Sequence, residues 1–468
     1  MTPFGWGSIA RLGLVQAALG AVVVLTTSTL NRVMVVELAL PALLPGVLVA
    51  LHYLVQVARP RMGHGSDGGG RRTPWIVGGM VVLAAGGLLA ATATVWMASH
   101  RAAGITLAVL AFALVGLGVS AAGTSLLVML AKRVPEGRRA GAATLVWMMM
   151  IAGFAVTAGV AGQLLEPYSP LRLLAVSAVV SVTAVAVACL ALWGVEGAVG
   201  PAGALAPLTG DAPRARASFR DALAQVWDEG AARHFTIFVF VSMLAYSAQD
   251  LILEPFAGTV FSLTPGASTK LSGVQHGGVL VGMILVALAG QLGQRWQARA
   301  VLRHVGSLRG WTVGGCLASA LALFGLTLGG LVGPGWPLQA NVFALGVANG
   351  AFSIGAIGSM MRLAGEGRAS REGVRMGLWG AAQAIAFGLG GLVGTAASDL
   401  AHWLMGAPAQ AYAAVFALEG LLFVMSALMA WRIGRMLAAS TQPAPREFAA
   451  GGIFPGVRDA RVAHAKQG

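Results

Sequence analysis

The sequence predicts an all-α polytopic membrane protein, with 12 transmembrane helices arranged as two six-helix bundles. Three observations support this fold class. The 468 residues are 57% hydrophobic and only 10% charged, whereas a soluble domain carries roughly 25% charged residues. The apolar residues gather in runs that reach or approach the ~20 residues needed to cross a bilayer as a helix. Short polar segments separate these runs, and some of them recur at about half the chain length.

The first six runs form an N-terminal six-helix bundle, residues 1–194. The opening run lacks a small-residue cleavage site after a short apolar core, so we expect a retained helix and not a signal peptide. The expected spans are 12–36, 41–58, 74–97, 104–131, 141–165 and 171–194.

The other six runs form a C-terminal bundle, residues 232–438. Between the bundles, residues 195–231 are rich in Ala, Pro, Gly and Arg, which is typical of a linker. Ser218 and Asp221 form a capping-box pattern there, so the linker is expected to include an amphipathic helix that packs on a bundle or docks a partner. Residues 439–468 are expected to form a flexible cytoplasmic tail. The expected spans are 233–259, 270–293, 308–331, 337–362, 373–400 and 410–432.

Small residues and cysteines constrain the packing. The chain has 66 glycines, and in membrane helices small residues let backbones approach closely. The clearest clusters are Gly153, Gly159 and Gly162 in the fifth run, and Gly390, Gly391 and Gly394 in the eleventh. Cys189 and Cys316 each fall inside an expected span, which supports neither a disulfide framework nor a cysteine metal site.

The basic residues predict the orientation. When alternate loops are assigned to opposite sides, 4 of the 31 Lys and Arg residues lie on one side and 27 on the other. An excess of basic residues marks the cytoplasmic side, so both termini are expected in the cytoplasm. The net charge of +14 therefore indicates topology and contact with anionic membrane lipid, and it does not indicate nucleic-acid binding. The four residues on the other side are Arg32, Arg101, Arg172 and Lys270.

Three recurring segments in the same order indicate an internal duplication of six spans plus six. The segment from Gly63 to Arg72 after the second run has a degenerate copy from Gly290 to Arg299 after the eighth. Residues 136–138 and 366–368 both read Glu-Gly-Arg, after the fourth and tenth runs. Asn31-Arg32 near the end of the first run corresponds to Gln249-Asp250 in the seventh. Repeats at half the chain length are typical of transporter folds.

The segment PRMGHGSDGGGRRTPW joins the second and third runs, and its spacing matches a loop motif of the major facilitator superfamily. The chain resembles that superfamily, except that Gly68 stands where a basic residue is usual. The resemblance implies that the motif ties the two halves together on the cytoplasmic side. The alternative is a short turn that simply collects Gly and Arg. The matching residues are Gly63, Asp67, Gly70, Arg71 and Arg72.

A closer resemblance rests on TLNRVMVVELALPALLPGVLVALHY in the first two runs, GSD and RRTPW in the loop, and YSAQDLILEPFAG in the seventh run. These segments resemble the PucC/LhaA light-harvesting complex assembly family, nearer the LhaA side. The resemblance implies a bacterial cytoplasmic or intracytoplasmic membrane and assembly of antenna complexes, the core antenna favoured. It implies bacteriochlorophyll as bound cargo, and antenna polypeptides, bacteriochlorophyll synthase and membrane insertion machinery as partners.

Charged residues near the ends of the first and seventh runs are candidates for an interbundle gate or clasp. Charges within a bilayer are costly, commonly ~2.5 to 3.5 kcal/mol each, and therefore tend to pair. The sequence predicts that Arg32 pairs with Asp250 or Glu254, with Glu37 close by. A gate would break when the halves rock, whereas a structural clasp would be permanent.

His52 and His276 occupy equivalent runs of the two halves and are candidate pigment ligands, because a bacteriochlorophyll magnesium accepts one axial nitrogen. The alternative is that each histidine bonds to a neighbouring helix. The run Trp147-Met148-Met149-Met150 either cradles a tetrapyrrole or simply packs, and Tyr53 and Trp379 share that ambiguity.

The ionisable residues favour an apolar cargo. The fourth and tenth runs carry no acid, and Glu419 in the twelfth is the main isolated intramembrane acid. No nucleophile with a base and an orienting acid is evident, and the glycine loop lacks the context of a phosphate-binding loop, so no enzyme is expected. The alternatives are a transporter of a small amphipathic solute and a pigment-free scaffold.

Overall fold

The computed structural model describes residues 4–56, 71–135, 138–196, 227–295, 307–366 and 372–440, in which all regular structure is helical. In the first half, α1 continues through two π-helical turns, η1 and η2, to Glu37. π-Helical turns are rare and are frequently found at functional sites. The elements are α1 (Trp6–Val24), η1 (Leu25–Thr29), α2 (Leu30–Arg32), η2 (Val33–Glu37), α3 (Leu43–Val55), α5 (Thr73–Trp96), α6 (Arg101–Arg133), α7 (Arg139–Leu164) and α8 (Pro170–Leu192).

The second half also consists of long helices, with one short 3-10 turn, η5. Its elements are α10 (Gly230–Phe261), α11 (Pro265–Arg295), α13 (Leu308–Val332), η5 (Gly333–Gly335), α14 (Leu338–Glu366), α15 (Glu372–Met405) and α16 (Pro408–Ser440). Each begins within a few residues of an expected span, which confirms the all-helical membrane fold.

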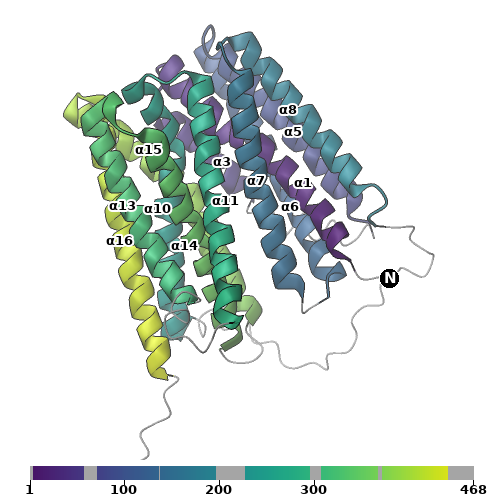
Figure 1. Cartoon of the computed structure of the whole chain (residues 1–468). Helices are drawn as coiled ribbons and strands as arrows, with labels where there is room; N and C mark the ends of the chain where they lie inside the picture. Colours follow the sequence, from purple (N-terminus) through teal and green to yellow (C-terminus); the bar gives the residue numbers. More distant parts are fainter. Residues whose placement is uncertain are drawn as a thin grey trace, which may run out of the picture.

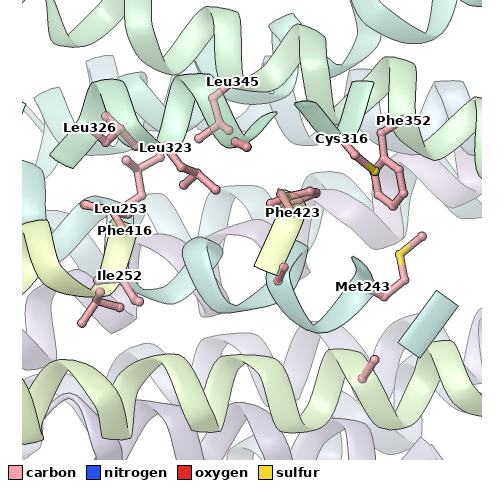
Figure 2. Packing of buried hydrophobic residues seen from close by; sticks show 14 of the residues in the cluster. Met243, Ile252, Leu253, Cys316, Leu323, Leu326, Leu345, Phe352, Phe416 and Phe423 are labelled. Carbon is pink, nitrogen blue, oxygen red and sulfur yellow. The ribbon is translucent and has the colours of Figure 1, made fainter. Parts of the chain in front are cut away.

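The helices form two bundles that lie side by side (Figure 1). The largest hydrophobic core draws only on residues 235–433, and a second core draws only on residues 4–195. Figure 2 shows the interior of the C-terminal bundle, where Phe423 of α16 packs near Phe352 of α14 with ring centroids 5.9 Å apart. Each bundle therefore buries apolar side chains of its own.

Eleven of the described helical segments are long and apolar enough to cross a membrane. The second expected span is the exception, because α3 has 13 residues and the described chain stops at Gln56. A helix of this length rises only ~20 Å. Its start is displaced toward Leu43 by a break at Ala39, whose φ of 48° is left-handed.

The first helix begins and the last helix ends at the same end of the bundles, the lower end in Figure 1. We call this the terminal end, and the other the opposite end. The arrangement agrees with an even number of crossings. That the terminal end faces the cytoplasm stays a prediction.

Glycines allow close approach at several of the expected places. A Cβ at Gly153 would lie 2.6 Å from the carbonyl oxygen of Ala17, and one at Gly394 would lie 2.9 Å from that of Ala248. Gly159 differs, because a Cβ there would meet no atom within 4 Å. The glycine clusters therefore lie where two helices pack closely, but not every glycine in a cluster touches the neighbouring helix.

Several predictions fall outside the described residues. They concern the loop-motif residues Gly63, Asp67 and Gly70, most of the 195–231 linker with Ser218 and Asp221, and the tail after residue 440.

Candidate interbundle site

The two bundles meet along two helix pairs, with α7 against α11 and α3 against α15. In the first pair the backbones touch near the opposite end, since a Cβ at Gly162 would lie 2.6 Å from the carbonyl oxygen of Gly266. In the second pair Tyr53 contacts Phe387, with ring centroids 5.9 Å apart. The segment from η1 to η2 also lies against α10.

Arg32 is the charged residue at the centre of this interface, and only 2% of its surface is exposed. Its Nη1 lies 2.5 Å from Oε1 of Glu37, and its Nη2 donates to the carbonyl oxygen of Leu263 at 2.6 Å. Leu263 follows the last turn of α10, so Arg32 binds the end of the first helix to the second bundle.

The prediction that Arg32 pairs with Asp250 or Glu254 is wrong, because its ion pair is with Glu37 in the same segment. The physical reason is the π-helical turn Val33–Glu37. A π-turn closes hydrogen bonds between residues five apart, which brings positions 32 and 37 to one side of the helix. In a regular α-helix, side chains three or four residues apart would meet instead.

Among the described residues, the second bundle gives Arg32 a close-fitting surface but no direct ion pair. A Cβ at Gly258 would lie 2.8 Å from Nη2 of Arg32, so the guanidinium rests against a glycine of α10. Glu254, one turn earlier, is close enough for its charge to interact with that of Arg32. Asp250 shares a hydrogen bond with Gln275 of α11.

A row of buried polar contacts joins the bundles beside Arg32. The hydroxyl oxygens of Ser28 and Ser272 are 3.2 Å apart, and those of Thr29 and Thr269 are 3.0 Å apart. Nδ2 of Asn31 donates to the carbonyl oxygen of Leu251 at 2.7 Å. The sequence analysis missed this row, although the TTSTLN segment of the first run was a signal for it.

Acidic residues add two further cross-bundle contacts at the opposite end. Asp399 of α15 accepts hydrogen bonds from the backbone N–H groups of Ala42 and Leu43 at 2.9 and 2.8 Å. It thereby satisfies the N-terminus of α3, where carboxylates are favourable. Glu166, which follows α7, accepts a hydrogen bond from the hydroxyl of Thr264. The sequence analysis missed both acids.

His52 and His276 have unlike surroundings. Nε2 of His52 lies 2.9 Å from Nε2 of Gln56, and the side chain is 3% exposed. Nδ1 of His276 lies 2.8 Å from the carbonyl oxygen of Ser272, and its ring meets that of Phe154 edge-on at 5.0 Å. Only an Nδ1–H can donate to a carbonyl, so Nε2 of His276 carries a lone pair.

An apolar seam runs between α7 and α11 next to His276. Its buried residues are Ile151, Val279 and Met283. The partly buried residues packed against them are Trp147, Met148, Met150, Phe154, Leu280 and Ile354. Most of the Trp–Met run therefore lies at the interbundle interface, whereas Trp379 is buried in the C-terminal core against Phe235.

At the terminal end, Glu196 binds the start of α5. Its carboxylate accepts hydrogen bonds from the backbone N–H of Arg72 at 2.6 Å and from the N–H and hydroxyl of Thr73 at 3.0 and 2.7 Å. Burial alone would raise the pKa of Glu196, but these hydrogen bonds and the charge of Arg133 lower it overall. The sequence analysis missed Glu196, which caps a helix from within the same bundle.

Comparison with known proteins covers nearly the whole chain. The family model described as PUCC protein matches residues 29–437. A Rhodobacter capsulatus protein named bacteriochlorophyll synthase 44.5 kDa chain is 51% identical over 94% of this chain and 98% of its own length. The uncharacterized protein of the puhA-bchM intergenic region in Rhodobacter capsulatus is 30% identical, over 90% and 88%. Protein PucC of Cereibacter sphaeroides is also 30% identical, over 89% and 90%.

Solved structures show the fold independently. A bacterial homolog of the lysosomal transporter Spinster, in an inward-facing and unoccupied conformation, superimposes with a TM-score of 0.65 and 15% identity, over 94% of this chain and 98% of its own. A D-xylose-proton symporter gives 0.67 and 13%, over 92% and 97%. These likenesses confirm the transporter-type fold. With the family model spanning residues 29–437, they confirm the expected family, and the chain belongs to the PUCC protein family.

Proposed function

We propose that the protein assists the assembly of light-harvesting antenna complexes, the core antenna favoured, as a non-enzymatic carrier of bacteriochlorophyll for nascent antenna polypeptides. Family membership supports the assembly role. The observation that carries the pigment role is His276, an imidazole with a lone pair on Nε2 beside the apolar seam between α7 and α11.

The surroundings of His276 suit an axial ligand for a pigment magnesium. A ligating histidine usually donates its other ring N–H to a carbonyl or carboxylate, which fixes the tautomer and raises the basicity of the ligand nitrogen. The carbonyl of Ser272 plays that part here. Methionine and aromatic side chains adapt to a flat apolar ring, and Met150 and Phe154 supply them. Nε2 of His52 is already engaged by Gln56, so His52 is the weaker candidate.

The pigment proposal is tested by an absorption spectrum of the protein, purified gently from a pigment-producing host. His276→Phe should lose co-purified bacteriochlorophyll, while His52→Phe serves as the matched control and should retain it. A wild-type protein without pigment would count against delivery. Equal pigment in all three proteins would remove both histidines as ligands.

The assembly role is tested by deletion in a phototroph, with the absorption bands of the core and peripheral antennae measured separately. Loss of the core band is expected. Cross-linking in membranes should then recover antenna polypeptides, and also the bacteriochlorophyll synthase and insertion machinery proposed as partners. Unchanged bands for both antennae would contradict the proposal. Normal antennae assembled by a chain that never binds pigment would identify a scaffold.

Transport of a small amphipathic solute is the second candidate, and the fold favours it because the similar solved structures include transporters. Uptake into vesicles that contain the purified protein tests it directly. The name of the 51% identical relative denotes a synthase chain. We propose that this chain acts beside such an enzyme and not as one, so the purified protein should show no pigment-synthase activity.

A further inference from the structure

The core of the C-terminal bundle contains a polar layer that the interbundle site does not use. It consists of one residue from each of four helices: Gln249 of α10, Ser319 of α13, Asn349 of α14 and Glu419 of α16. Glu419 is 3% exposed, and the other three are 0% exposed.

Apolar residues labelled in Figure 2 flank these four positions along their helices. On each helix the polar residue falls between apolar residues that pack in the same core. The flanking pairs are Met243 and Ile252 on α10, Cys316 and Leu323 on α13, Leu345 and Phe352 on α14, and Phe416 and Phe423 on α16.

Contacts between the helices support this register. Oγ of Ser319 donates to Oδ1 of Asn349 at 2.8 Å, which joins α13 to α14. The ring of Phe256 on α10 meets that of Phe416 on α16 at 4.9 Å. The rings of Phe352 on α14 and Phe423 on α16 are 5.9 Å apart. Because α14 and α16 are parallel, Asn349, one turn before Phe352, lies at the level of Glu419, one turn before Phe423.

The layer has more polar atoms than partners. Both carboxyl oxygens of Glu419, both amide atoms of Gln249 and Nδ2 of Asn349 are buried and make no hydrogen bond. A buried carboxylate without a partner is strongly disfavoured, and the group takes up a proton instead. A neutral carboxyl group has one O–H donor and a carbonyl acceptor, which complement the amides of Gln249 and Asn349.

One titratable neighbour of Glu419 opposes its ionisation, and the other described titratable groups of the adjacent helices lie nearer the two ends of the bundle. From α10, the charge of Asp250 repels that of Glu419. From α13, Cys316 lies on the terminal side of the layer. From α15, His402 lies toward the opposite end, with its ring 4.7 Å from that of Tyr412, and Asp399 is bound to the start of α3.

We propose that Glu419 is a proton-binding site within the C-terminal bundle and that Asp250 is the group through which its proton exchanges. Asp250 is only partly buried, whereas Glu419 is enclosed. A proton therefore reaches the carboxylate of Glu419 by way of the carboxyl group of Asp250 and leaves by the same route. The site is separate from His276 and does not rest on pigment binding.

Infrared spectroscopy of the full-length protein in an ester-free detergent tests the site. Protonated carboxyl groups have a carbonyl band well separated from that of carboxylates. At neutral pH the wild-type protein should show such a band, and Glu419→Gln should lose it. Asp228→Asn, which alters an exposed acid, should leave it unchanged. If Glu419→Gln does not fold, ¹³C-glutamate labelling of the wild-type protein should shift the band. A band that neither change affects, or the absence of a band, overturns the proposal.

Hydrogen–deuterium exchange tests the route, because the carboxyl band shifts when D₂O replaces H₂O. Asp250→Asn should slow the shift of the Glu419 band relative to the wild-type protein and to Asp228→Asn. An unchanged exchange rate in a folded Asp250→Asn protein would overturn the role of Asp250.

Discussion

The two ends of the molecule are held together differently. At the opposite end, polar contacts cross from one bundle to the other, through Arg32 and Leu263, Asn31 and Leu251, and Asp399 and the start of α3. At the terminal end, the bonds of Glu196 to Arg72 and of Arg309 to the carbonyl of Trp431 stay within one bundle. In these described contacts, hydrogen bonds join the two bundles at the opposite end and link helices of a single bundle at the terminal end.

This difference suits a protein whose halves rock about a closed end. Buried cross-bundle hydrogen bonds hold the opposite end, while the apolar seam between α7 and α11 is held by packing that is not directional. Among the described residues named above, separation of the bundles at the opposite end would break the bonds of Arg32, Asn31 and Asp399, whereas the bonds of Glu196 and Arg309 at the terminal end would stay intact. Substitutions at the two ends should therefore have different effects on stability and on the distance between bundles.

The largest effect is expected for Arg32→Gln, which removes the ion pair with Glu37 and the bond to Leu263. Breaking a buried pair costs about 3 to 5 kcal/mol, and the exposure of Glu37 should reduce this to roughly 2 kcal/mol. The free energy of unfolding, measured by denaturing-detergent titration, and the abundance in membranes should both fall.

Glu37→Gln is the control for Arg32→Gln, because it removes the ion pair and leaves the cross-bundle bond to Leu263. Its loss of stability should be smaller. A larger loss for Glu37→Gln would mean that the contact within the first segment dominates. Normal abundance and normal antenna assembly in Arg32→Gln would exclude both a gate and a clasp.

Gly162→Ala should come next, because the added Cβ would lie 2.6 Å from the carbonyl oxygen of Gly266 and force α7 away from α11. Overpacking of this kind typically costs about 1 to 3 kcal/mol. Gly159→Ala, one turn away, is the matched control, because its Cβ would meet no atom within 4 Å. Equal melting temperatures for the two variants would show that the backbones do not touch at Gly162.

The fold could be predicted from the sequence because bilayer thickness sets the length of the apolar runs, and loop charge marks the two sides. The partners of the polar residues could not. The ion pair of Arg32 depends on a π-turn that composition does not indicate. Asp399 and Leu43 are 356 positions apart, so their contact follows from the packing of α3 on α15. Gly159 and Gly162 look alike in sequence, and only the neighbouring helix distinguishes them.

Asp399→Ala should produce a smaller loss, because it removes two hydrogen bonds to the start of α3. Loss of a capping carboxylate typically costs about 1 kcal/mol. Because this cap comes from the other bundle, the variant should also widen the distance between spin labels placed on α3 and α15. Asp399→Asn keeps one acceptor oxygen and should recover part of the loss. A destabilised protein with an unchanged label distance would contradict a cross-bundle role.

The smallest effect is expected for Glu196→Gln at the terminal end, below about 1 kcal/mol because the site is partly exposed. The folded pKa of Glu196 lies below its ordinary value, so its carboxylate stabilises the protein above the unfolded pKa of roughly 4.3. This contribution is lost as pH falls through the folded pKa. The stability difference between the wild-type protein and Glu196→Gln should therefore be full at neutral pH and vanish in acid. Because Glu196 binds only its own bundle in this contact, the interbundle label distance should not change. A change in that distance would show that the terminal end is also tied across the bundles.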